Sequence, residues 1–329
     1  MEPSSSLSFA IPCRNGAKYL PALLRSLLEQ EGPLPKILLV DDASTDGSVQ
    51  IAKEIGGERI QVFRHEGTLG IPENWNRCAA LVDTEFFCLA HQDDLYRPSF
   101  GRRMVEALRA SPEACFAHCQ AQSVDAEGRP LHSLIDRRKA VFFREEEDEG
   151  TAALAFLFSG NWITCPSIVF RTEAFRRWGS FDARYHFVPD WEYSFRVLLG
   201  GGRIKAVPEI LLSYRRHEEQ ATREAISDFE RYREELALLN KVREQATLLG
   251  LGESLPEKPA AVRNNLLFDA YQDLLQGRRR EALEKLRFAA KELPGCRWDV
   301  LVLGTRLLAP LGRLGGKTLS LGLQLFLRA

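Results

Sequence analysis

Two apolar segments of the chain each lead into a pair of aspartates, and this feature most constrains what the chain can fold into. Ile37–Val40 runs directly into Asp41–Asp42, and Phe86–Leu89 is followed shortly afterwards by Asp93–Asp94. Short apolar runs bounded by polar turns are typical of buried strands. Because open α/β sheets bind ligands at the carboxyl ends of their strands, the pattern predicts carboxylates gathered at one edge of a sheet. A polar turn that only caps the next helix is the alternative interpretation of Asp41–Asp42 alone.

Two neighbouring strands that end on carboxylates can place several oxygen atoms around one hard cation. Mg²⁺ and Mn²⁺ prefer oxygen ligands and usually share their coordination sphere with the phosphates of a substrate. The paired aspartates therefore predict a divalent cation, Mn²⁺ or Mg²⁺, as cofactor. They also favour a substrate that carries phosphate.

Strand and helix patterns alternate along the first two thirds of the chain, which is typical of βαβ units and a parallel sheet. Strands are expected at residues 7–11, 37–40, 61–64, 86–89, 115–121, 167–171 and 203–206, and helices near 19–29, 49–55, 73–81 and 191–199. We therefore predict an α/β fold with a mixed, mainly parallel sheet flanked by helices, in one domain over residues 1–220.

After residue 220 the sequence has helical patterns without strands, which predicts an all-helical C-terminal region over 221–329. A helical hairpin is expected at about 261–293. The tail, 297–329, has five basic residues against one acidic residue and a broad apolar face, a composition that suits anionic lipid headgroups. We predict peripheral membrane contact through this tail, and packing of its apolar face on the catalytic domain is the alternative.

Composition indicates which partners and which cellular locations are expected. A net charge of −1 argues against nucleic acid as a partner. Seven cysteines without a Cys-x-x-Cys pair favour a reducing compartment, and no apolar stretch has the length of a signal peptide or a membrane span. The expected location is cytoplasmic, with a possible peripheral position at the cytoplasmic face of a membrane.

Four motifs, taken together, resemble the family-two glycosyltransferases of GT-A fold. They are Phe9–Gly16, Val40–Ser48, Gly67–Gly70 with Asn76, and His91–Asp94, in the family's order and at its spacing. The resemblance implies a metal-dependent enzyme that moves a sugar from a nucleotide-diphosphate donor to a hydroxyl of a saccharide or lipid-linked acceptor, with inversion at the anomeric carbon. Assembly of a cell-surface polysaccharide or glycolipid is the expected process.

The donor-binding residues that the resemblance implies follow the strand ends or open the next helix: Pro12, Arg14, Asn15, Asp41, Asp42, Asn76, His91, Gln92 and Asp93. Asp41 or Asp42 would recognise the nucleobase, and Asn76 would face the pyrophosphate. The family commonly has an Asp-x-Asp triplet where this chain has His91-Gln92-Asp93. Asp93 keeps the metal role, whereas His91 replaces the acid that contacts the ribose in the family and is alternatively a structural histidine.

The catalytic base that the resemblance implies is Asp190, and its alternative role is to cap the helix that follows. Glu192 is a weaker substitute base on the acceptor side, together with Trp162 and Trp191. His217, in a Tyr-Arg-Arg-His element, is expected to bind the metal or a phosphate, unless this element is only a basic surface cluster. The charged stretch within 133–151 is either solvated surface or an acceptor loop.

Three other classes fit less well. A nucleotidyltransferase needs a better phosphate loop than Cys13–Lys18, and a nicotinamide oxidoreductase needs a G-x-G-x-x-G motif after the first strand. A non-catalytic nucleotide-sugar-binding or scaffold protein, acting through its helical C-terminal region, stays open as the alternative function.

Overall fold

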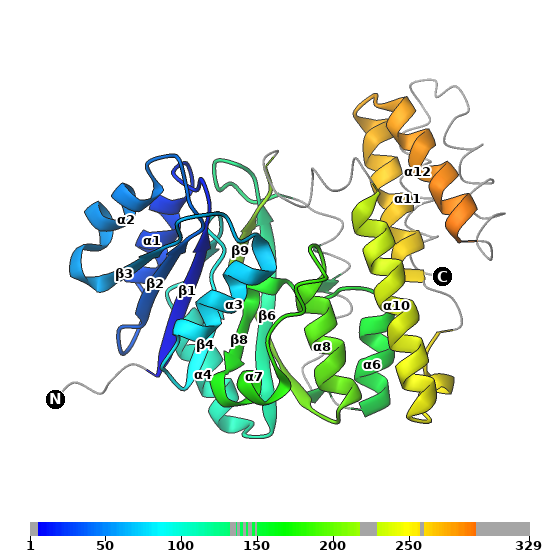
Figure 1. Cartoon of the computed structure of the whole chain (residues 1–329), viewed down its shortest axis with the longest axis horizontal. Coiled ribbons are helices and arrows are strands. Elements are labelled where there is room, and N and C mark those ends of the chain that lie inside the picture. The colour runs from blue at the N-terminus through cyan, green and yellow to red at the C-terminus, as the bar shows by residue number, and fades with distance from the viewer. Residues whose placement is uncertain are drawn as a thin grey trace.

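The computed structural model describes residues 6–131, 136, 139–140, 143, 147–148, 150–217, 229–256 and 260–293. Its centre is one twisted sheet with the strand order β3-β2-β1-β4-β8-β6-β9-β5, and β7 pairs with β9 (Figure 1). The strands are β1 (Leu7–Cys13), β2 (Lys36–Asp41), β3 (Ile60–Arg64), β4 (Phe86–Leu89), β5 (Leu95–Tyr96), β6 (Ala114–Val124), β7 (Glu147–Asp148), β8 (Ile168–Arg171) and β9 (Arg203–Arg215).

Helices cover both faces of the sheet. They are α1 (Leu20–Leu28), α2 (Ser48–Gly56), α3 (Ile71–Leu81), α4 (Phe100–Ala110), α6 (Gly150–Ser159), α7 (Thr172–Trp178), α8 (Pro189–Leu199), α10 (Glu230–Leu248), α11 (Ala260–Leu275) and α12 (Arg279–Glu292). One core contains buried residues of α1, α2 and α4, and the other contains those of α3 and α6 to α8.

The alternation of side chains along the central strands explains this arrangement. Phe9 and Ile11 of β1 belong to the core on the α1 side, whereas Ala10 between them belongs to the core on the α3 side. Successive side chains of a strand point to opposite faces, so a continuous apolar run indicates a strand that is buried on both. The runs Leu7–Cys13 and Lys36–Asp41 are such strands, as the sequence predicts.

The expected fold class is confirmed, with two differences in detail. The pairs among β1 to β4 and the pair β6–β9 are parallel, but β8 inserts antiparallel to both β4 and β6. The last core strand extends over Arg203–Arg215 instead of stopping at residue 206, because it pairs with β6 along nearly all of its length. This extension carries the chain to the edge where the aspartates lie.

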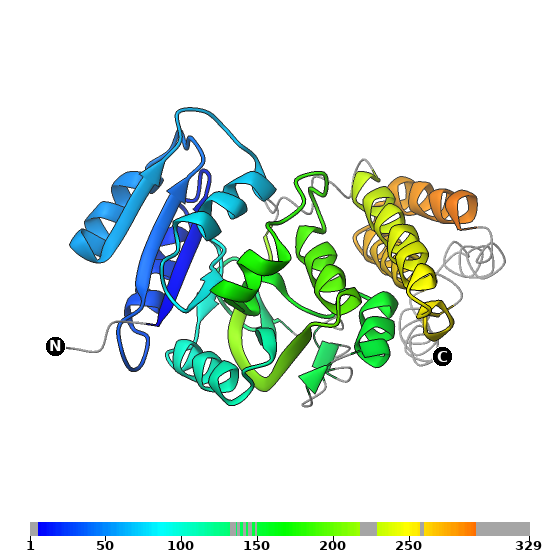
Figure 2. The ribbon, with the colours of Figure 1, turned by 60° about the horizontal axis from the view of Figure 1, so that its bottom comes forward.

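The helices of the C-terminal region lie at the end of the molecule remote from β3 and α2 (Figures 1 and 2). α10 packs on α8, α11 contacts α6, and α11 and α12 lie side by side as the expected hairpin. Within the described residues, no helix is both long enough and apolar enough to cross a membrane. The tail 297–329 and most of the charged stretch within 133–151 lie outside the described residues. Membrane contact through the tail and an acceptor loop in the charged stretch therefore stay predictions. The domain boundary near residue 220 also stays a prediction.

Candidate active site

The loops after β1 and β2 meet at the carboxyl edge of the sheet. Cys13 and Asp41 are register partners at the ends of these strands, so the residues that follow them lie together. The backbone N–H of Asn15 donates to Ser44 Oγ at 2.9 Å, and the Oδ1 atom of Asn15 accepts from the N–H of Thr45 at 2.9 Å. Asn15 has a left-handed backbone with φ of 49°, which asparagine tolerates better than most residues. Its side chain therefore joins the two loops.

The carboxylate of Asp42 holds the loop that precedes α3. Its Oδ1 accepts from the N–H of Leu69 at 2.6 Å, and its Oδ2 accepts from the N–H of Gly70 at 3.1 Å. The guanidinium of Arg14 lies 4.0 Å from the same carboxylate, and just over half of its side chain is exposed. Both carboxylate oxygens of Asp42 therefore already accept hydrogen bonds from the backbone. The side chain of Arg14, in contrast, keeps exposed surface at this edge.

Asp41 is fully buried beside it. Its Oδ2 accepts from the N–H of Ser44 at 3.1 Å and lies 3.4 Å from Nε of Arg64. Its other oxygen, Oδ1, is buried and has no hydrogen-bond partner among the described residues. Since a buried polar atom usually has a partner, Asp41 offers an acceptor that a ligand at this edge could use.

Gln92 bridges the ends of β1 and β4. Its Oε1 accepts from the N–H of Arg14 at 2.9 Å, and its Nε2 donates to the carbonyl of Arg14 at 3.0 Å. A Cβ at Gly16 would lie 2.6 Å from this Oε1, so the bridge requires glycine there. Pro12, half-buried near the end of β1, lies in register with Val40 of β2.

Asp93 and His217 come from distant parts of the chain and meet at this edge. Nε2 of His217 lies 2.8 Å from Oδ2 of Asp93, and the imidazole packs on the ring of Tyr19 with centroids 4.6 Å apart. Burial acts to raise the pKa of Asp93, but the hydrogen bond of His217 and the nearby imidazoles of His91 and His217 outweigh it, so the pKa is lowered. Asp93 is therefore ionised at neutral pH.

Arg215 holds the turn that contains both aspartates. Its side-chain Nε donates to the carbonyl of Asp93 at 2.7 Å, its Nη1 donates to the carbonyl of Ala126 at 2.6 Å, and its backbone N–H donates to Oδ1 of Asp94 at 2.9 Å. Burial and the adjacent charge of Asp93 raise the pKa of Asp94 well above its usual range. Arg215 is thus a buried structural clamp, which leaves Arg216 as the basic residue of this element with more exposed surface.

His91, the residue that replaces the expected acid, packs on an aromatic ring. Its imidazole lies against Trp75 with centroids 5.1 Å apart, and its Nε2 is buried without a hydrogen-bond partner among the described residues. Burial lowers the pKa of His91, so the ring is neutral at pH 7. A neutral imidazole can donate or accept one hydrogen bond at each nitrogen according to its tautomer.

Asn76 uses both ends of its amide within the protein. Its Nδ2 donates to the carbonyl of Phe181 at 2.9 Å, and its Oδ1 accepts from the N–H of Phe181 at 2.8 Å. These bonds fix the loop between α7 and α8. The role of Asn76 toward a pyrophosphate stays a prediction, and in this geometry each end of the amide already makes one hydrogen bond.

Asp190 lies within the first turn of α8 and not at its cap, because the helix begins one residue earlier at Pro189. The carboxylate is 9% exposed, and its partners are the side chain of Asn161 and the backbone N–H of Trp191. Burial raises its pKa to about 6, against the opposing effects of these hydrogen bonds and of the Lys139 charge. A carboxylate with this pKa is largely ionised at pH 7 and is a better proton acceptor than an exposed aspartate.

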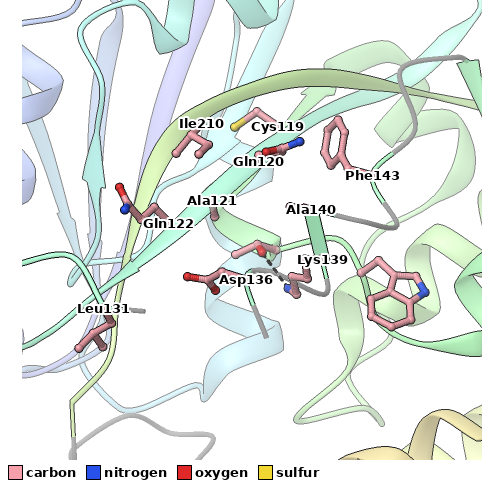
Figure 3. A pocket seen from close by; sticks show the side chains of 12 residues that line it. Cys119, Gln120, Ala121, Gln122, Leu131, Asp136, Lys139, Ala140, Phe143 and Ile210 are labelled. Carbon is pink, nitrogen blue, oxygen red and sulfur yellow. Dashed lines mark hydrogen bonds between the residues drawn. The ribbon is translucent and has the colours of Figure 1, made fainter. Parts of the chain in front are cut away.

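A pocket of about 230 Å³ is lined by Cys119–Gln122 of β6 and by Leu131, Asp136, Lys139, Ala140 and Phe143 (Figure 3). Trp162 and Thr164, which follow Asn161 closely in the sequence, also line it. Phe143 and Trp162 supply aromatic walls, and Asp136, Lys139 and Gln120 supply polar groups. Trp162 is fixed by hydrogen bonds from its Nε1 to the carbonyl of Phe156 at 3.0 Å and to Ser159 Oγ at 3.1 Å. The pocket combines apolar rings with hydrogen-bonding groups, as sites for small polar ligands do.

The other two predicted acceptor-side residues have other surroundings. Trp191 is 1% exposed and donates its indole N–H to the carbonyl of Leu157 in the core, so it offers no surface to an acceptor. Glu192 lies 2.9 Å from Nη2 of Arg196 and 3.8 Å from Nζ of Lys241 on α10. Its carboxylate is thus paired on the side of α8 that faces α10, and its role as substitute base stays a prediction.

Sequence reasoning placed Asn161 in an acceptor-side loop but gave it no role of its own, and it missed Lys139 and the clamping role of Arg215. Asn161 directly precedes Trp162, so a polar residue next to a predicted acceptor aromatic was the available signal. Nothing in the pattern of the charged stretch distinguishes Lys139 from its neighbours. Among the described residues, no three or more His, Cys, Asp or Glu side chains gather as a metal-binding group.

Comparisons with known proteins identify the family of this chain. Residues 8–175 match the profile of the family described as glycosyl transferase family 2. An uncharacterized glycosyltransferase of Rickettsia typhi is 25% identical over 234 residues, which is 70% of each chain. An uncharacterized protein of Mycobacterium tuberculosis is 28% identical over 64% of this chain and 67% of its own.

Two solved structures share the fold. TarS from S. aureus, in complex with UDP-GlcNAc, aligns with a TM-score of 0.57 and 16% identity over 85% of this chain and 89% of its own. The mannosyltransferase PcManGT from Pyrobaculum calidifontis, in complex with GDP-Man and Mn²⁺, aligns with a TM-score of 0.58 and 15% identity over 94% and 82%. These likenesses confirm the expected GT-A-type fold.

Proposed function

The chain belongs to glycosyl transferase family 2, and from this premise we propose that it transfers a sugar from a nucleotide-diphosphate donor to a hydroxyl acceptor with inversion. The observation that carries the proposal is the buried carboxylate of Asp190, whose pKa is raised to about 6. Its hydrogen-bond partner Asn161 directly precedes Trp162, a wall of the pocket. An inverting transfer needs one base at the acceptor hydroxyl, and the raised pKa of Asp190 supports this role.

The acceptor hydroxyl enters, in this proposal, from the pocket walled by Trp162 and Phe143. Asp190 accepts the hydroxyl proton while the oxygen attacks the anomeric carbon on the face opposite the diphosphate. A single displacement of this kind inverts the anomeric configuration. Asn161 keeps the carboxylate oriented during the step, and the partly closed pocket limits competition from water.

The diphosphate leaves, in this proposal, from the edge where Asp93 and His217 meet. Oδ2 of Asp93 and Nε2 of His217 lie 2.8 Å apart in a direct hydrogen bond, which would open when a cation binds. A carboxylate oxygen together with an imidazole nitrogen suits Mn²⁺ better than Mg²⁺, which prefers oxygen ligands, and phosphate and water would supply the remaining ligands. When bound, such a cation neutralises charge on the departing diphosphate. Arg216, on the same element as His217, is placed to pair with phosphate oxygens.

The nucleoside part of the donor is assigned to the ends of β1 and β2. Asp41 supplies the unsatisfied buried acceptor there, and Arg14 supplies an exposed cation next to Asp42. The bound UDP-GlcNAc of TarS and GDP-Man of PcManGT support a nucleotide-sugar donor of this general kind. The acceptor, the pathway and the cytoplasmic or membrane-peripheral location stay predictions.

A donor screen tests the proposal that the nucleotide-sugar donor binds together with a metal ion. The midpoint of thermal unfolding is measured with UDP-, GDP-, CMP- and dTDP-sugars, each with and without Mn²⁺, because a ligand that binds the folded state raises this midpoint. We expect one donor to raise it only when Mn²⁺ is present, and Asp93→Asn to lose that rise. Asp83→Asn is the matched control, because Asp83 is exposed and pairs with Lys36 on the surface. An Asp93→Asn protein with the full manganese-dependent rise contradicts the assignment.

The stereochemical part has its own test. Once a donor and acceptor are found, ¹H NMR of the first product formed reports its anomeric configuration. We expect inversion relative to the donor. A product with retained configuration contradicts the single displacement, whatever the behaviour of the Asp190 variants.

A further inference from the structure

A glutamate of the C-terminal region holds the segment that leads to Asp190. Glu234, near the start of α10, places its carboxylate against three consecutive backbone N–H groups. Its Oε2 accepts from the N–H of His186 at 2.8 Å, and its Oε1 accepts from the N–H groups of Phe187 at 2.6 Å and Val188 at 2.9 Å. The last of these groups lies directly before α8, whose first turn contains Asp190.

The start of α8 explains why an acceptor from another helix is useful there. A helix usually begins at a polar side chain that accepts hydrogen bonds from free backbone N–H groups. The N-cap of α8 is Val188, whose side chain is apolar and cannot accept, and Pro189 follows it. Successive backbone N–H groups at a helix start favour an anion, and the helix dipole adds to this preference. The carboxylate of Glu234 supplies that anion.

A second residue of α10 contacts the chain on the other side of Asp190. Nζ of Lys241 lies 3.8 Å from Oε1 of Glu192 and 5.3 Å from the ring centroid of Tyr185. Lys241 follows Glu234 by about two helical turns, so both side chains lie on one face of α10. This helix, which packs on α8, therefore holds the chain both before and after Asp190.

We propose that Glu234 is a positioning residue for sugar transfer, because its carboxylate fixes the start of α8 and so keeps Asp190 in place for the acceptor hydroxyl. The helical C-terminal region thereby completes the acceptor side of the site. The proposal rests on the proposed function, since a fixed Asp190 affects turnover only if Asp190 is the base. The contact itself is a property of the resting protein and is measurable without donor or acceptor.

A small displacement of Asp190 is enough to affect turnover. A reacting group that is misplaced by about 1 Å can cost roughly 10²-fold in rate, because the reacting atoms must be close and aligned. Loss of the Glu234 carboxylate frees the N–H groups beside the first turn of α8, which can then fray. A glutamate of purely structural value would instead contribute to stability and leave kcat unchanged wherever the protein is folded.

The first measurement is hydrogen–deuterium exchange of the full-length protein, followed by mass spectrometry of peptides that cover 183–192. In Glu234→Ala we expect roughly tenfold faster exchange in these peptides, because their amides lose the hydrogen bonds that protect them. Glu234→Gln keeps the length and one acceptor oxygen, so its exchange should be intermediate. Glu235→Ala is the matched control, because Glu235 bonds instead to Arg231 at 2.8 Å and to Asn265 of α11 at 3.1 Å.

The second measurement is kcat together with donor affinity, at a temperature at which circular dichroism shows each variant to be folded. We expect Glu234→Ala to lower kcat at least tenfold with unchanged donor affinity, and Glu234→Gln to recover part of this loss. Glu235→Ala should keep the wild-type kcat. If Glu234→Ala does not fold, Glu234→Gln carries both measurements, with the same expected directions.

Wild-type exchange of 183–192 in the Glu234 variant overturns the proposal. Faster exchange with a wild-type kcat also overturns it, because Glu234 then only stabilises the segment. An equal loss of kcat in Glu235→Ala overturns it as well, since the loss then follows from general destabilisation. A wild-type protein that transfers no sugar from any donor contradicts the proposed function, and faster exchange in Glu234→Ala would then leave Glu234 as a structural cap without a positioning role.

Discussion

The proposed donor half and the proposed acceptor half of the site use their polar side chains in opposite ways. In the donor half, Asp42, Gln92 and Asn76 each bind backbone groups of another segment through two hydrogen bonds. In the proposed acceptor half, Asp190 is buried and Lys139 lines the pocket, and each has a pKa displaced toward neutrality. The residues that are expected to bind the donor therefore also hold their part of the fold together. In the proposed acceptor half, by contrast, the buried carboxylate of Asp190 lowers the stability of the folded protein when it is ionised.

This difference has consequences for substitutions. A side chain that satisfies buried backbone groups contributes to stability, and its removal leaves those groups unpaired at about 1–3 kcal/mol each. A buried carboxylate with a raised pKa opposes folding when it is ionised, so its neutralisation favours folding. Substitutions in the donor half should lower stability, and those in the acceptor half should lower activity without lowering stability.

The largest expected effect is that of Asp190→Asn on turnover. Removal of a general base typically costs ~10²–10⁴-fold in rate, and donor affinity should be unchanged because Asp190 lies in the acceptor half. The measurement is kcat together with donor binding by calorimetry. A variant that turns over at more than one tenth of the wild-type rate contradicts the role of Asp190.

The same variant should not be less stable than the wild type at pH 8. The pKa of Asp190 rises from 3.8 to about 6 on folding, so the folded state binds the proton more tightly and ionisation opposes folding. This destabilisation begins above pH 3.8 and is complete above about pH 6. Urea unfolding at pH 5 and pH 8 checks the sign, and a loss of stability in Asp190→Asn that grows with pH contradicts it.

Arg215→Ala should have the next largest effect, this time on stability. The substitution leaves the carbonyls of Asp93 and Ala126 without their donors in a buried turn, and we expect a loss of about 2–4 kcal/mol in the free energy of unfolding. Arg129→Ala is the control, because Arg129 pairs with Asp125 on the surface, where solvent screens the pair, and its removal should change stability much less. Equal losses in the two variants would contradict the clamp.

Asn76→Ala should have the smallest of these effects, a loss of about 1–2 kcal/mol, because both hydrogen bonds to Phe181 disappear. Donor affinity should change by less than the stability does. This experiment can contradict the claim that polar side chains of the proposed donor half contribute mainly to stability. Unchanged stability with a tenfold weaker donor affinity would instead place Asn76 at the pyrophosphate.

The sequence predicted the features that depend on neighbours along the chain. Apolar runs next to acids located the ends of β2 and β4, and the spacing of apolar residues located α8 close to Asp190. Contacts between distant segments were not predictable, because no local pattern encodes them. Asn76 meets Phe181 across 105 residues, and Arg215 meets Asp93 across 122. The surroundings of Trp191, a core residue in the structure, depend in the same way on the packing of α6 against α8.

The raised pKa of Asp190 is a chemical property that the sequence could not predict either. An aspartate after a proline at a helix start has two interpretations, as a cap or as a base. Only burial by the residues around Asn161 and Lys139 distinguishes them, and this burial is a property of the tertiary structure. His91 is similar, since its packing on Trp75 explains a neutral ring that the motif alone leaves open.

The most direct test of the whole account is the pH dependence of kcat/KM for sugar transfer between pH 4.5 and 8. Since the free enzyme must carry an ionised base, the account predicts a rate that rises with pH and levels off near the Asp190 pKa of about 6, and an Asp190→Asn variant whose residual rate lacks this limb. A wild-type profile that is flat across this range, or the same limb in Asp190→Asn, would contradict the account.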